Sequence, residues 1–433
     1  MSNVTATLVH NMTTSLMSGN DTFPYDNGAA FFDEKQCYVS ALVFCGAFVC
    51  SGGGIGGGGV FVPSFLLGLG LTAHWALPLS QVTILGVGLG SCLFLVPRRH
   101  PTLDRRLIDM NLAALLEPAT LLGTIPGVIL NVVFPAYIIT ILLVLLLAVT
   151  AYTTLKKGYD QRRAENAVQT TYERGHVQSD PTSPLLAAAK QTKYGHVQSD
   201  PATEQPTVPV IVLPASKTGT ESAHDGVWRW YQIGALVASC AVLAGTLAVK
   251  LLFECGTWQY WALVCAPIPV IGFFCVYFAF QPPKRSRFPW IWTVAGLTAG
   301  LVAGFLGIGG GMVKSPLMIS MGTTPQVATA TASFMILFTS AATTLQFYLA
   351  GRLRWEFMLW YGGIGMTGSF LGQFVLARIV KHYNRQSWVS FFVGVVIVGC
   401  AIAMVATNVI NILGGTASMA FSNVCASNST ASH

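Results

Sequence analysis

Long stretches of apolar residues with almost no charge alternate with short polar connections along this chain. From Gln36 to Pro97 there is no formally charged residue, and from Trp290 to Gly351 the only one is Lys314. Such stretches are typical of a lipid bilayer, which one helix of about 20 apolar residues can cross and where backbone groups must pair internally. The pattern predicts helices over 37–55, 77–97, 108–131, 134–155, 229–253, 258–280, 290–306, 325–349, 357–380 and 387–412. We therefore expect an all-α, polytopic transmembrane helical bundle with about 10–12 membrane segments.

Two of the apolar stretches are interrupted near their middle by dense runs of glycine. The first run lies between Ser51 and Val60, and the second lies between Gly307 and Ser315. An ordinary membrane helix does not contain such a run, because glycine weakens a helix and adopts backbone conformations that other residues avoid. We predict that both membrane segments are broken at these glycines.

The two glycine runs belong to an internal repeat. An offset of about 253 positions pairs Pro63 with Pro316 and Gly56 to Gly58 with Gly309 to Gly311. At a slightly shorter offset, Gly123 and Gly127 pair with Gly368 and Gly372. Glycine- and proline-interrupted segments at matching places in two halves indicate the binding site of a secondary transporter.

Charged residues define the connections and the domain boundaries. Of the 41 charged residues, 17 lie between Lys156 and Arg229, in a Pro-, Ser- and Thr-rich segment. We divide the chain into an extracytoplasmic tail (1–36), a first membrane repeat (37–155), a cytoplasmic disordered loop (156–228), connecting membrane helices (229–281), a second membrane repeat (290–412) and a polar C-terminal tail (413–433). With the N-terminus outside, the two repeats enter the membrane from opposite sides and are inverted copies. This scheme places Arg352 and Arg354 outside, against the tendency of basic residues to stay inside.

Features of the polar tails favour the same orientation. Asn-x-Ser/Thr glycosylation patterns begin at Asn3, Asn11, Asn20 and Asn428. They predict an integral, multi-pass glycoprotein in the plasma membrane or an endomembrane of a eukaryote.

The ten cysteines are scattered, and at most Cys37, Cys255 and Cys425 lie near segment ends where a disulfide could form. A duplicated Gly-His-Val-Gln-Ser-Asp-Pro motif in the central loop lacks the neighbouring ligands of a metal site, so we predict no metal.

Composition excludes several classes of protein. The chain of 433 residues is 53% hydrophobic and 9% charged, which is too apolar for a soluble globular protein. Its net charge of +7 reflects the loops, and no basic and aromatic pattern of a nucleic-acid-binding module is present. The run from Gly307 to Ser315 superficially resembles a phosphate-binding loop, but Val313 stands where that motif requires glycine. We predict neither an enzyme nor a cofactor.

Several motifs resemble one known family. They are Gly307-Ile-Gly-Gly-Gly-Met-Val-Lys-Ser-Pro-Leu317, the segment Gly322 to Ser333, Gly56-Gly-Gly-Gly-Val-Phe-Val-Pro63, Ala76-Leu-Pro-Leu-Ser80 and the segment Leu107 to Pro118. Together they resemble the TauE/SafE sulfite exporter family, also called the four-toluene sulfonate uptake permeases, in its eukaryotic branch. The likeness covers about 36–155 and 229–412. It implies transport of small sulfur-containing anions such as sulfite, sulfonates or thiosulfate across a bilayer.

The glycine runs are the natural place for such an anion. A helix broken within the membrane exposes N–H donors and the positive end of its dipole, and glycine lets an anion approach them closely. The predicted backbone donors are Gly56, Gly57, Gly58, Gly309, Gly310 and Gly311. The alternative is that the glycines only allow helices to cross closely, which suits Gly-x-x-x-Gly spacings such as Gly300 to Gly304.

Polar side chains just after the two runs form a second group of candidates. Ser80 and Gln81 follow the first run, and Thr329, Thr331 and Ser333 follow the second. Thr329 and Ser333 share a helix face, whereas Thr331 points elsewhere. These groups are candidates for contacts to an oxyanion, or for hydrogen bonds between helices and back to a carbonyl.

Lys314 and Glu117 are the ionisable residues within the apolar segments to which we assign candidate roles. Lys314 would supply a positive charge to the anion or extend towards a membrane interface. Glu117 would carry a proton coupled to the substrate or pair structurally. The expected function is thus a secondary transporter working by alternating access, with the proton as candidate coupling ion. An anion channel and a receptor or scaffold acting through the central loop are the alternatives, and the oligomeric state stays open.

Overall fold

The computed structural model describes residues 34–52, 54, 56–99, 106–177, 230–250, 252–253, 256–280, 289–321, 323–383 and 387–413. Throughout these ranges the regular structure is helical, apart from one isolated bridge between Arg99 and Arg106. Several predictions concern residues outside the described ranges. These are the glycosylation sites, most of the central loop, Cys255 and Cys425. The prediction of an all-helical membrane bundle is confirmed.

In the described residues, the first half of the chain contributes five helices and one π-helical turn. These are α2 (Glu34–Ser51), α3 (Gly58–Pro63), η1 (Ser64–Gly68), α4 (Ala73–Leu95), α5 (Met110–Val133) and α6 (Ala136–Val177). The start of α5 shows how local sequence sets a boundary, since the side chain of Asp109 accepts a hydrogen bond from the N–H of Leu112 at 3.1 Å. Helices α2, α4, α5 and α6 overlap the predicted helices, and α3 begins within the first glycine run.

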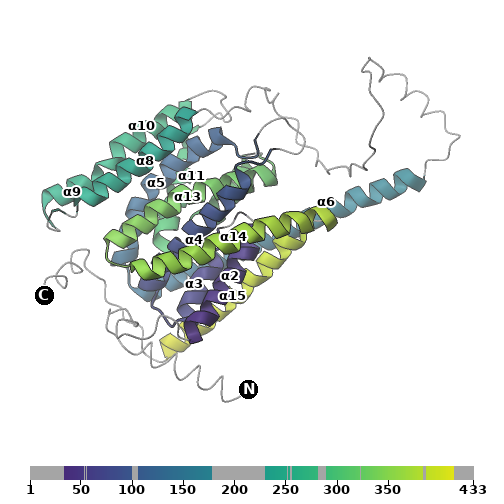
Figure 1. Cartoon of the computed structure of the whole chain (residues 1–433), viewed down its shortest axis with the longest axis horizontal. Helices are drawn as coiled ribbons and strands as arrows, with labels where there is room; N and C mark the ends of the chain where they lie inside the picture. Colours follow the sequence, from purple (N-terminus) through teal and green to yellow (C-terminus); the bar gives the residue numbers. More distant parts are fainter. Residues whose placement is uncertain are drawn as a thin grey trace.

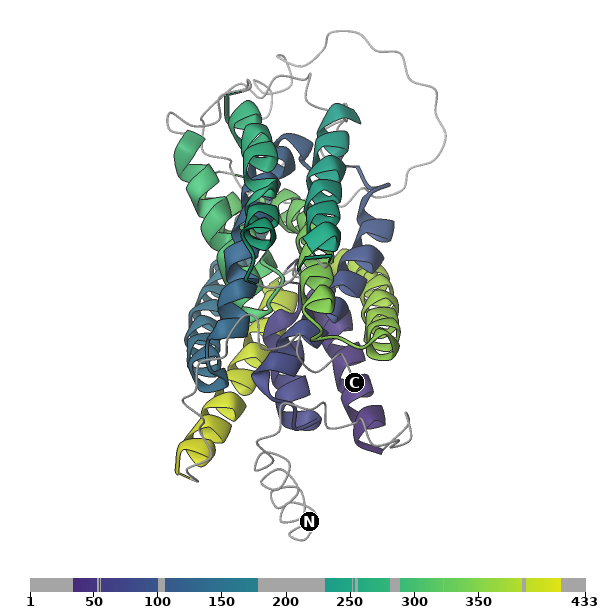
Figure 2. The same cartoon turned by 90° about the vertical axis from the view of Figure 1, so that its left-hand side faces the viewer.

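The second half begins with α8 (Trp230–Lys250), α9 (Trp258–Cys265) and α10 (Pro267–Phe280). It continues with α11 (Pro289–Leu306), α12 (Gly311–Ser320), α13 (Pro325–Leu349), α14 (Trp355–Tyr383) and α15 (Ser387–Leu413). Figures 1 and 2 both place α8, α9 and α10 along one side of the bundle and α2, α3 and α15 on the opposite side.

One boundary differs from the prediction. The sequence predicts a disordered loop from residue 156, but α6 continues as a helix to Val177 and projects beyond the other helices (Figure 1). The physical reason is that polarity ends a membrane span without ending a helix, and Arg, Glu, Gln and Ala are all good helix formers in water. Residues 178–229 lie outside the described residues, so the rest of the loop stays a prediction.

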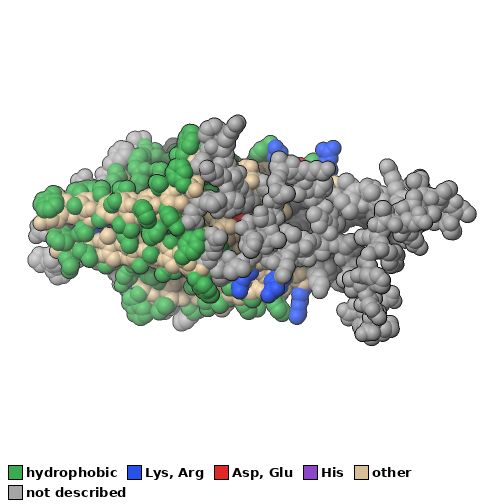
Figure 3. Space-filling view, turned by 90° about the horizontal axis from the view of Figure 1, so that it is seen from above, with side chains coloured by type: hydrophobic (Ala, Val, Ile, Leu, Met, Phe, Trp, Pro, Cys, Tyr) green, Lys and Arg blue, Asp and Glu red, His purple; other side chains and the backbone are tan. Residues whose placement is uncertain are grey.

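The outer surface is apolar, as a bilayer requires. Six of the described helices are long and apolar enough to cross a membrane, and shorter apolar helices lie beside them. On the face shown in Figure 3, apolar side chains spread widely, and Lys and Arg side chains lie towards one end of this surface. Large apolar side chains such as Phe273, Val276 and Phe280 on α10 are exposed. The protein is therefore an integral, multi-pass membrane protein.

Each half of the chain packs closely against the other half. Helix α5 crosses α11, and α2 crosses α14. At the first crossing, a Cβ atom added to Gly304 would lie 2.8 Å from the carbonyl oxygen of Thr124. At the second, a Cβ atom added to Gly368 would lie 3.0 Å from the carbonyl oxygen of Phe44. The predicted close approach of small residues is thus confirmed, and it joins the two halves.

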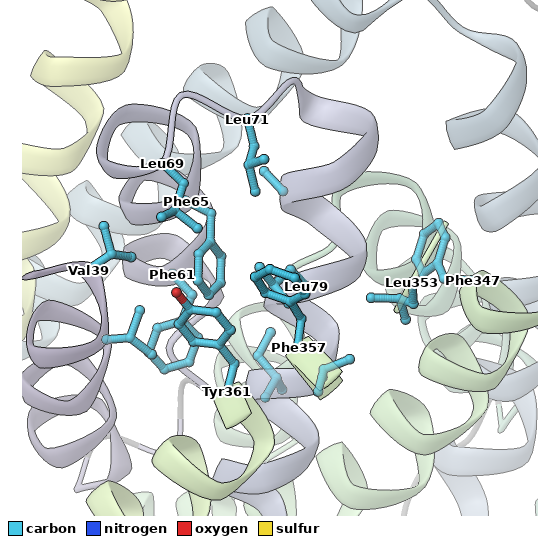
Figure 4. Packing of buried hydrophobic residues seen from close by; sticks show 14 of the residues in the cluster. Val39, Phe61, Phe65, Leu69, Leu71, Leu79, Phe347, Leu353, Phe357 and Tyr361 are labelled. Carbon is cyan, nitrogen blue, oxygen red and sulfur yellow. The ribbon is translucent and has the colours of Figure 1, made fainter. Parts of the chain in front are cut away.

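An aromatic cluster fills the core on the side of the first glycine run (Figure 4). Phe65 and Tyr361 meet edge to face with their ring centroids 4.9 Å apart, and Phe357 stacks on Tyr361. Phe61 on α3 is fully buried in the same cluster. These contacts attach α3 and η1 to α14, so the short broken helix has a defined position in the core.

Candidate functional site

The two glycine runs adopt the same backbone conformation. Positive φ angles occur at Gly54 (65°), Gly56 (78°), Gly57 (79°), Gly307 (63°), Gly309 (70°) and Gly310 (69°). The first three glycines pair with the last three at the offset that the repeat predicts. Only glycine adopts this conformation without steric cost, because a Cβ atom would press against the backbone. The predicted break in each half is therefore confirmed. Both breaks are formed in the same way, by three glycines with positive φ angles at matching positions.

Each break ends one helix and starts another. Helix α2 ends at Ser51 and α3 starts after Gly57, while α11 ends at Leu306 and α12 starts after Gly310. The first N–H groups of α3 and α12 have no carbonyl partner one turn earlier in their own helix. These groups belong to Gly58 and Gly59 in α3 and to Gly311 and Met312 in α12, since the N–H groups of Val60 and Val313 bond to the carbonyl oxygens of Gly57 and Gly310. Two of the six predicted backbone donors, Gly58 and Gly311, are among them.

The two breaks lie against each other in the core. A Cβ atom added to Gly58 would lie 2.6 Å from the Cα atom of Ile308 in the other break. The hydroxyl group of Ser315 donates a hydrogen bond to the carbonyl oxygen of Gly54 at 3.1 Å. The predicted meeting of the two interrupted segments is therefore present in the structure.

Carbonyl groups at the end of α11 are bound by side chains from the first half. Gln81 Nε2 donates to the carbonyl oxygen of Ala303 at 2.8 Å, Asn131 Nδ2 to that of Phe305 at 2.7 Å and Ser80 Oγ to that of Gly307 at 3.0 Å. The carbonyl end of a broken helix must find such partners inside a membrane. Because these carbonyls are already bound, the N–H ends of α3 and α12 are the backbone groups better placed for a ligand.

This arrangement defines the positions of Ser80 and Gln81, which the sequence singled out. Both side chains lie at the second break, although they belong to the first repeat, and both are fully buried. The hydroxyl hydrogen of Ser80 is committed to a carbonyl group. Gln81 has one end of its amide committed, while its Oε1 atom is buried without a hydrogen-bond partner among the described residues. Gln81 therefore keeps one acceptor that a ligand or a water molecule can satisfy.

The three hydroxyl residues of α13 take different positions. Thr329 packs on the first break, where a Cβ atom added to Gly54 would lie 2.8 Å from its carbonyl oxygen. Thr331 Oγ1 accepts a hydrogen bond from the backbone N–H of Asp109 at 3.0 Å. Ser333 donates to the carbonyl oxygen of Thr329 at 3.0 Å, one turn earlier in the same helix. The structure thus shows the back-bonding alternative for Ser333 and places Thr331 away from the pair, as helical spacing predicts.

A narrow pocket lies beside the first break. Gly54 and Gly56 line it together with three serines, Ser51, Ser91 and Ser333. The free width inside it does not admit a water-sized sphere. The pocket lies between α2, α4 and α13 and is too narrow for a water molecule in this conformation.

A buried ion pair lies at the second break. Lys314 Nζ is 2.6 Å from Glu117 Oε2 and donates to Thr339 Oγ1 at 2.5 Å. The Thr339 hydroxyl group donates to Glu117 Oε1 at 2.6 Å, and all three residues are fully buried. Lys314 therefore does not extend towards a membrane interface, and the two ionisable residues, 197 positions apart, are partners.

Comparison with known proteins agrees with this geometry. Residues 39–189 and 182–404 match the family model described as Sulfite exporter TauE/SafE. The chain belongs to the TauE/SafE family. It is 30% identical over 415 residues to Sulfite exporter TauE/SafE family protein 3 of Arabidopsis thaliana, covering 90% of this chain and 83% of that protein.

Other relatives within and beyond plants match as well. Sulfite exporter TauE/SafE family protein 2 of Arabidopsis thaliana is 28% identical, with 82% of this chain and 79% of that protein covered. The Probable membrane transporter protein YunE of Bacillus subtilis is 32% identical over 110 residues, which cover 24% of this chain and 39% of that protein. No solved structure matches the chain significantly. As a TauE/SafE protein, the chain is a membrane transporter.

Sequence reasoning missed several polar residues of this TauE/SafE protein. Thr339 lies in the middle of α13, and Ser91 and Asn131 lie near the C-terminal ends of α4 and α5. A single threonine, asparagine or serine in an apolar helix has no distinguishing local pattern. Ser51 was the residue with a detectable signal, because it directly precedes the first glycine run. The remaining positions became recognisable only from the packing of the helices.

Proposed function

We propose that this protein is a secondary transporter that moves small sulfur-containing anions, sulfite or an organosulfonate, by alternating access. The observation that carries the proposal is the pair of facing helix breaks. Their backbone conformation is the same, and the carbonyls at the end of α11 are bound by Gln81, Asn131 and Ser80. A pair of breaks whose N–H ends are the better placed backbone groups favours an anion over a cation.

The backbone of α3 and α12 supplies the electrostatic part of the proposed site. An anion that leaves water loses hydrogen bonds, and the first N–H groups of a helix and its dipole replace them. The predicted donors are Gly56, Gly57 and Gly58 in one half and Gly309, Gly310 and Gly311 in the other. Glycine leaves these amides accessible because no Cβ atom stands in front of them.

Gln81 adds a preference among oxyanions. Its unpartnered Oε1 atom is an acceptor, which repels a fully deprotonated oxyanion and binds one that carries an O–H group. Hydrogen sulfite, the singly charged form, has such a group available, whereas an organosulfonate has none. The contact with Gln81 therefore favours hydrogen sulfite, a monoanion, over an organosulfonate.

The closed pocket favours a carrier over a channel. A pocket that does not admit a water-sized sphere cannot conduct an ion without rearrangement. The close crossings of α5 with α11 and of α2 with α14 join helices into stiff pairs, so we propose that these pairs move as units. The inverted relation of the two repeats, which this motion requires, is part of the proposal.

The membrane potential sets the direction of uncoupled transport. One charge crossing 100 mV corresponds to about 2.3 kcal/mol, so an inside-negative membrane favours the exit of an anion. Accumulation of the anion inside would require coupling to another ion.

Flux measurements in proteoliposomes test the proposal. We expect saturable uptake of radiolabelled sulfite, weaker uptake of sulfate, and acceleration of labelled sulfite entry by unlabelled sulfite inside the vesicles. This counterflow occurs in a carrier and is absent from a channel. Absence of any saturable sulfite or sulfonate flux in folded protein would exclude the proposed function.

A further inference from the structure

We propose that Glu117 and the transported anion alternate as the partner of Lys314. In the closed state without substrate, the Glu117 carboxylate neutralises the buried ammonium group. When an anion takes this place, Glu117 takes up a proton, so that each monoanion crosses together with one proton. This inference depends on the proposed transport of anions and adds the residue pair that couples it to the proton.

The position of Lys314 places its charge at the second break. A Cβ atom added to Gly310 would lie 3.4 Å from Cε of Lys314, so the lysine side chain extends back along α12 towards the break. Its Nζ atom then reaches Glu117 on α5 and Thr339 on α13. The ammonium group therefore lies beside the N-terminal turn of α12, and the carboxylate of Glu117 already occupies an anion position next to that turn.

Because the pair is buried, the anion and the Glu117 carboxylate must replace each other one for one as the partner of Lys314. Among the described residues, Glu117 and Lys314 are the only buried Lys, Arg, Asp or Glu side chains. Releasing the carboxylate from the ammonium group without a substitute would leave two unpaired charges inside the protein, at a large cost. The anion therefore replaces the carboxylate only when the carboxylate becomes neutral.

The surroundings contain few groups that could take the proton instead of Glu117. Helix α13 contributes the hydroxyl group of Thr339, which does not titrate in water. Helix α8 contributes the thiol group of Cys240, which interacts electrostatically with both charges and donates to the carbonyl oxygen of Phe338 at 4.0 Å. Helices α5 and α12 contribute Glu117 and Lys314 themselves. Glu117 is the one carboxylate of this cluster.

The matching position in the first repeat carries no charge. Phe61 pairs with Lys314 at the offset of the repeat, and it lies in the aromatic cluster with Phe65 and Tyr361 (Figure 4). The ion pair is therefore present at only one of the two breaks. Because the protein has one such ion pair among its described residues, we expect one proton to cross in each transport cycle.

The charge balance of the exchange is simple. On the open side, water reaches Glu117, whose carboxylate accepts a proton from it and becomes a carboxylic acid. The monoanion pairs with the Lys314 ammonium group, so the cluster has no net charge both before and after the exchange. On the other side the anion leaves, Glu117 loses its proton to water, and the original ion pair forms again.

Thr339 is a positioning residue in this scheme. Its hydroxyl oxygen accepts a hydrogen bond from Lys314, and the same hydroxyl group donates a hydrogen bond to Glu117. Thr339 therefore fixes the positions of the ammonium and carboxylate groups relative to each other. Thr343 lies one turn later on α13, and its hydroxyl group donates to the backbone carbonyl oxygens of Thr339 and Ser340. Thr343→Val is therefore a matched control for Thr339→Val.

The decisive experiment measures labelled sulfite in proteoliposomes as net flux driven by a pH gradient and as counterflow at equal pH. In the wild type, we expect the gradient to drive net flux with one proton per anion. In Glu117→Gln, the ammonium group still needs an anion, so we expect counterflow to survive at a reduced rate. Gradient-driven net flux should fall by at least about tenfold, because no carboxylate remains to release the proton.

Three further variants complete the test. In the double variant Glu117→Gln/Lys314→Met no buried charge remains, and we expect a folded protein with neither gradient-driven flux nor tight sulfite binding. Thr339→Val should shift the pH at which flux is half maximal, whereas Thr343→Val should leave that pH in place.

Each result has a definite meaning. Gradient-driven flux that persists in Glu117→Gln or in the double variant overturns the inference and leaves the proposed transport intact. If wild-type vesicles carry neither sulfite nor a sulfonate, the inference fails together with the proposed function.

Discussion

At the scale of single residues, the proposed function depends on glycines whose backbone conformation disfavours a side chain. Gly57 and Gly310 immediately precede α3 and α12 in a left-handed conformation. A side chain at either position would be strained and would stand beside the N–H groups that the proposed site uses. Stability and ligand binding therefore depend on the same backbone atoms.

A Gly310→Ala substitution should impair both. We expect a loss of about 1–2 kcal/mol in unfolding free energy, because alanine is disfavoured at positive φ, and weaker sulfite flux. Thermal unfolding in detergent and flux in vesicles measure the two effects. Gly272→Ala is the matched control: Gly272 lies in α10 with open space around it, and its change should stay within about 0.5 kcal/mol.

The Lys314 and Glu117 pair predicts a non-additive stability effect. Lys314→Met leaves a buried carboxyl group without its partner, and we expect a loss of up to about 3–5 kcal/mol. Adding Glu117→Gln should restore most of it, because a neutral pair needs no counter-charge. The measurement is thermal unfolding of both single variants and the double variant. Simple addition of the two single effects would contradict the ion pair.

At the scale of helices, small residues let pairs of helices from different halves touch along their backbones. On α5, Gly123 and Gly127 face α11, and on α11, Gly300 and Gly304 face α5. Gly368 and Gly372 on α14 repeat this arrangement against α2. The same contact thus occurs at two crossings, each of which joins the two halves of the proposed carrier.

A larger side chain at this crossing should push the helices apart. We expect Gly127→Leu to cost about 1–3 kcal/mol by overpacking, because a Cβ atom there would lie 2.5 Å from the carbonyl oxygen of Leu301. Gly245→Leu on α8 introduces the same side chain where nothing lies within 4 Å. Unfolding temperatures of the two variants should differ, and equal values would argue against a close crossing.

At the scale of the whole molecule, neither half forms its own site. The first repeat supplies Ser80, Gln81 and Glu117 to the break in the second repeat, and Ser315 of the second repeat binds the break in the first. The aromatic cluster and the ion pair occupy matching positions but differ in chemistry. The two breaks therefore share their pattern of positive φ angles but differ in their charges.

The central loop is expected to be dispensable for transport. Both breaks, the pocket and the ion pair lie outside residues 180–227. Replacing that segment with a Gly/Ser linker of equal length should leave sulfite flux in vesicles within about twofold of the wild type. Loss of flux in a folded variant would instead support a protein that acts through its loop.

The membrane helices, both breaks and the repeat followed from the sequence alone. Apolar stretches without charge and dense glycine runs act locally, so neighbouring residues are enough to predict what they form. The same local reasoning placed the end of the fourth long helix too early, because the polarity change near Lys156 marks the end of a membrane span and α6 continues to Val177.

The partners of the polar side chains were decided only by the tertiary structure. Lys314 and Glu117 stand 197 positions apart, and Ser80 and Gln81 bind carbonyl groups more than 220 positions away. Periodicity shows which face of a helix a residue occupies, but the direction of that face depends on which helices pack together. Inside a membrane every buried polar group needs a partner, and the packing of the two halves determines which one it finds.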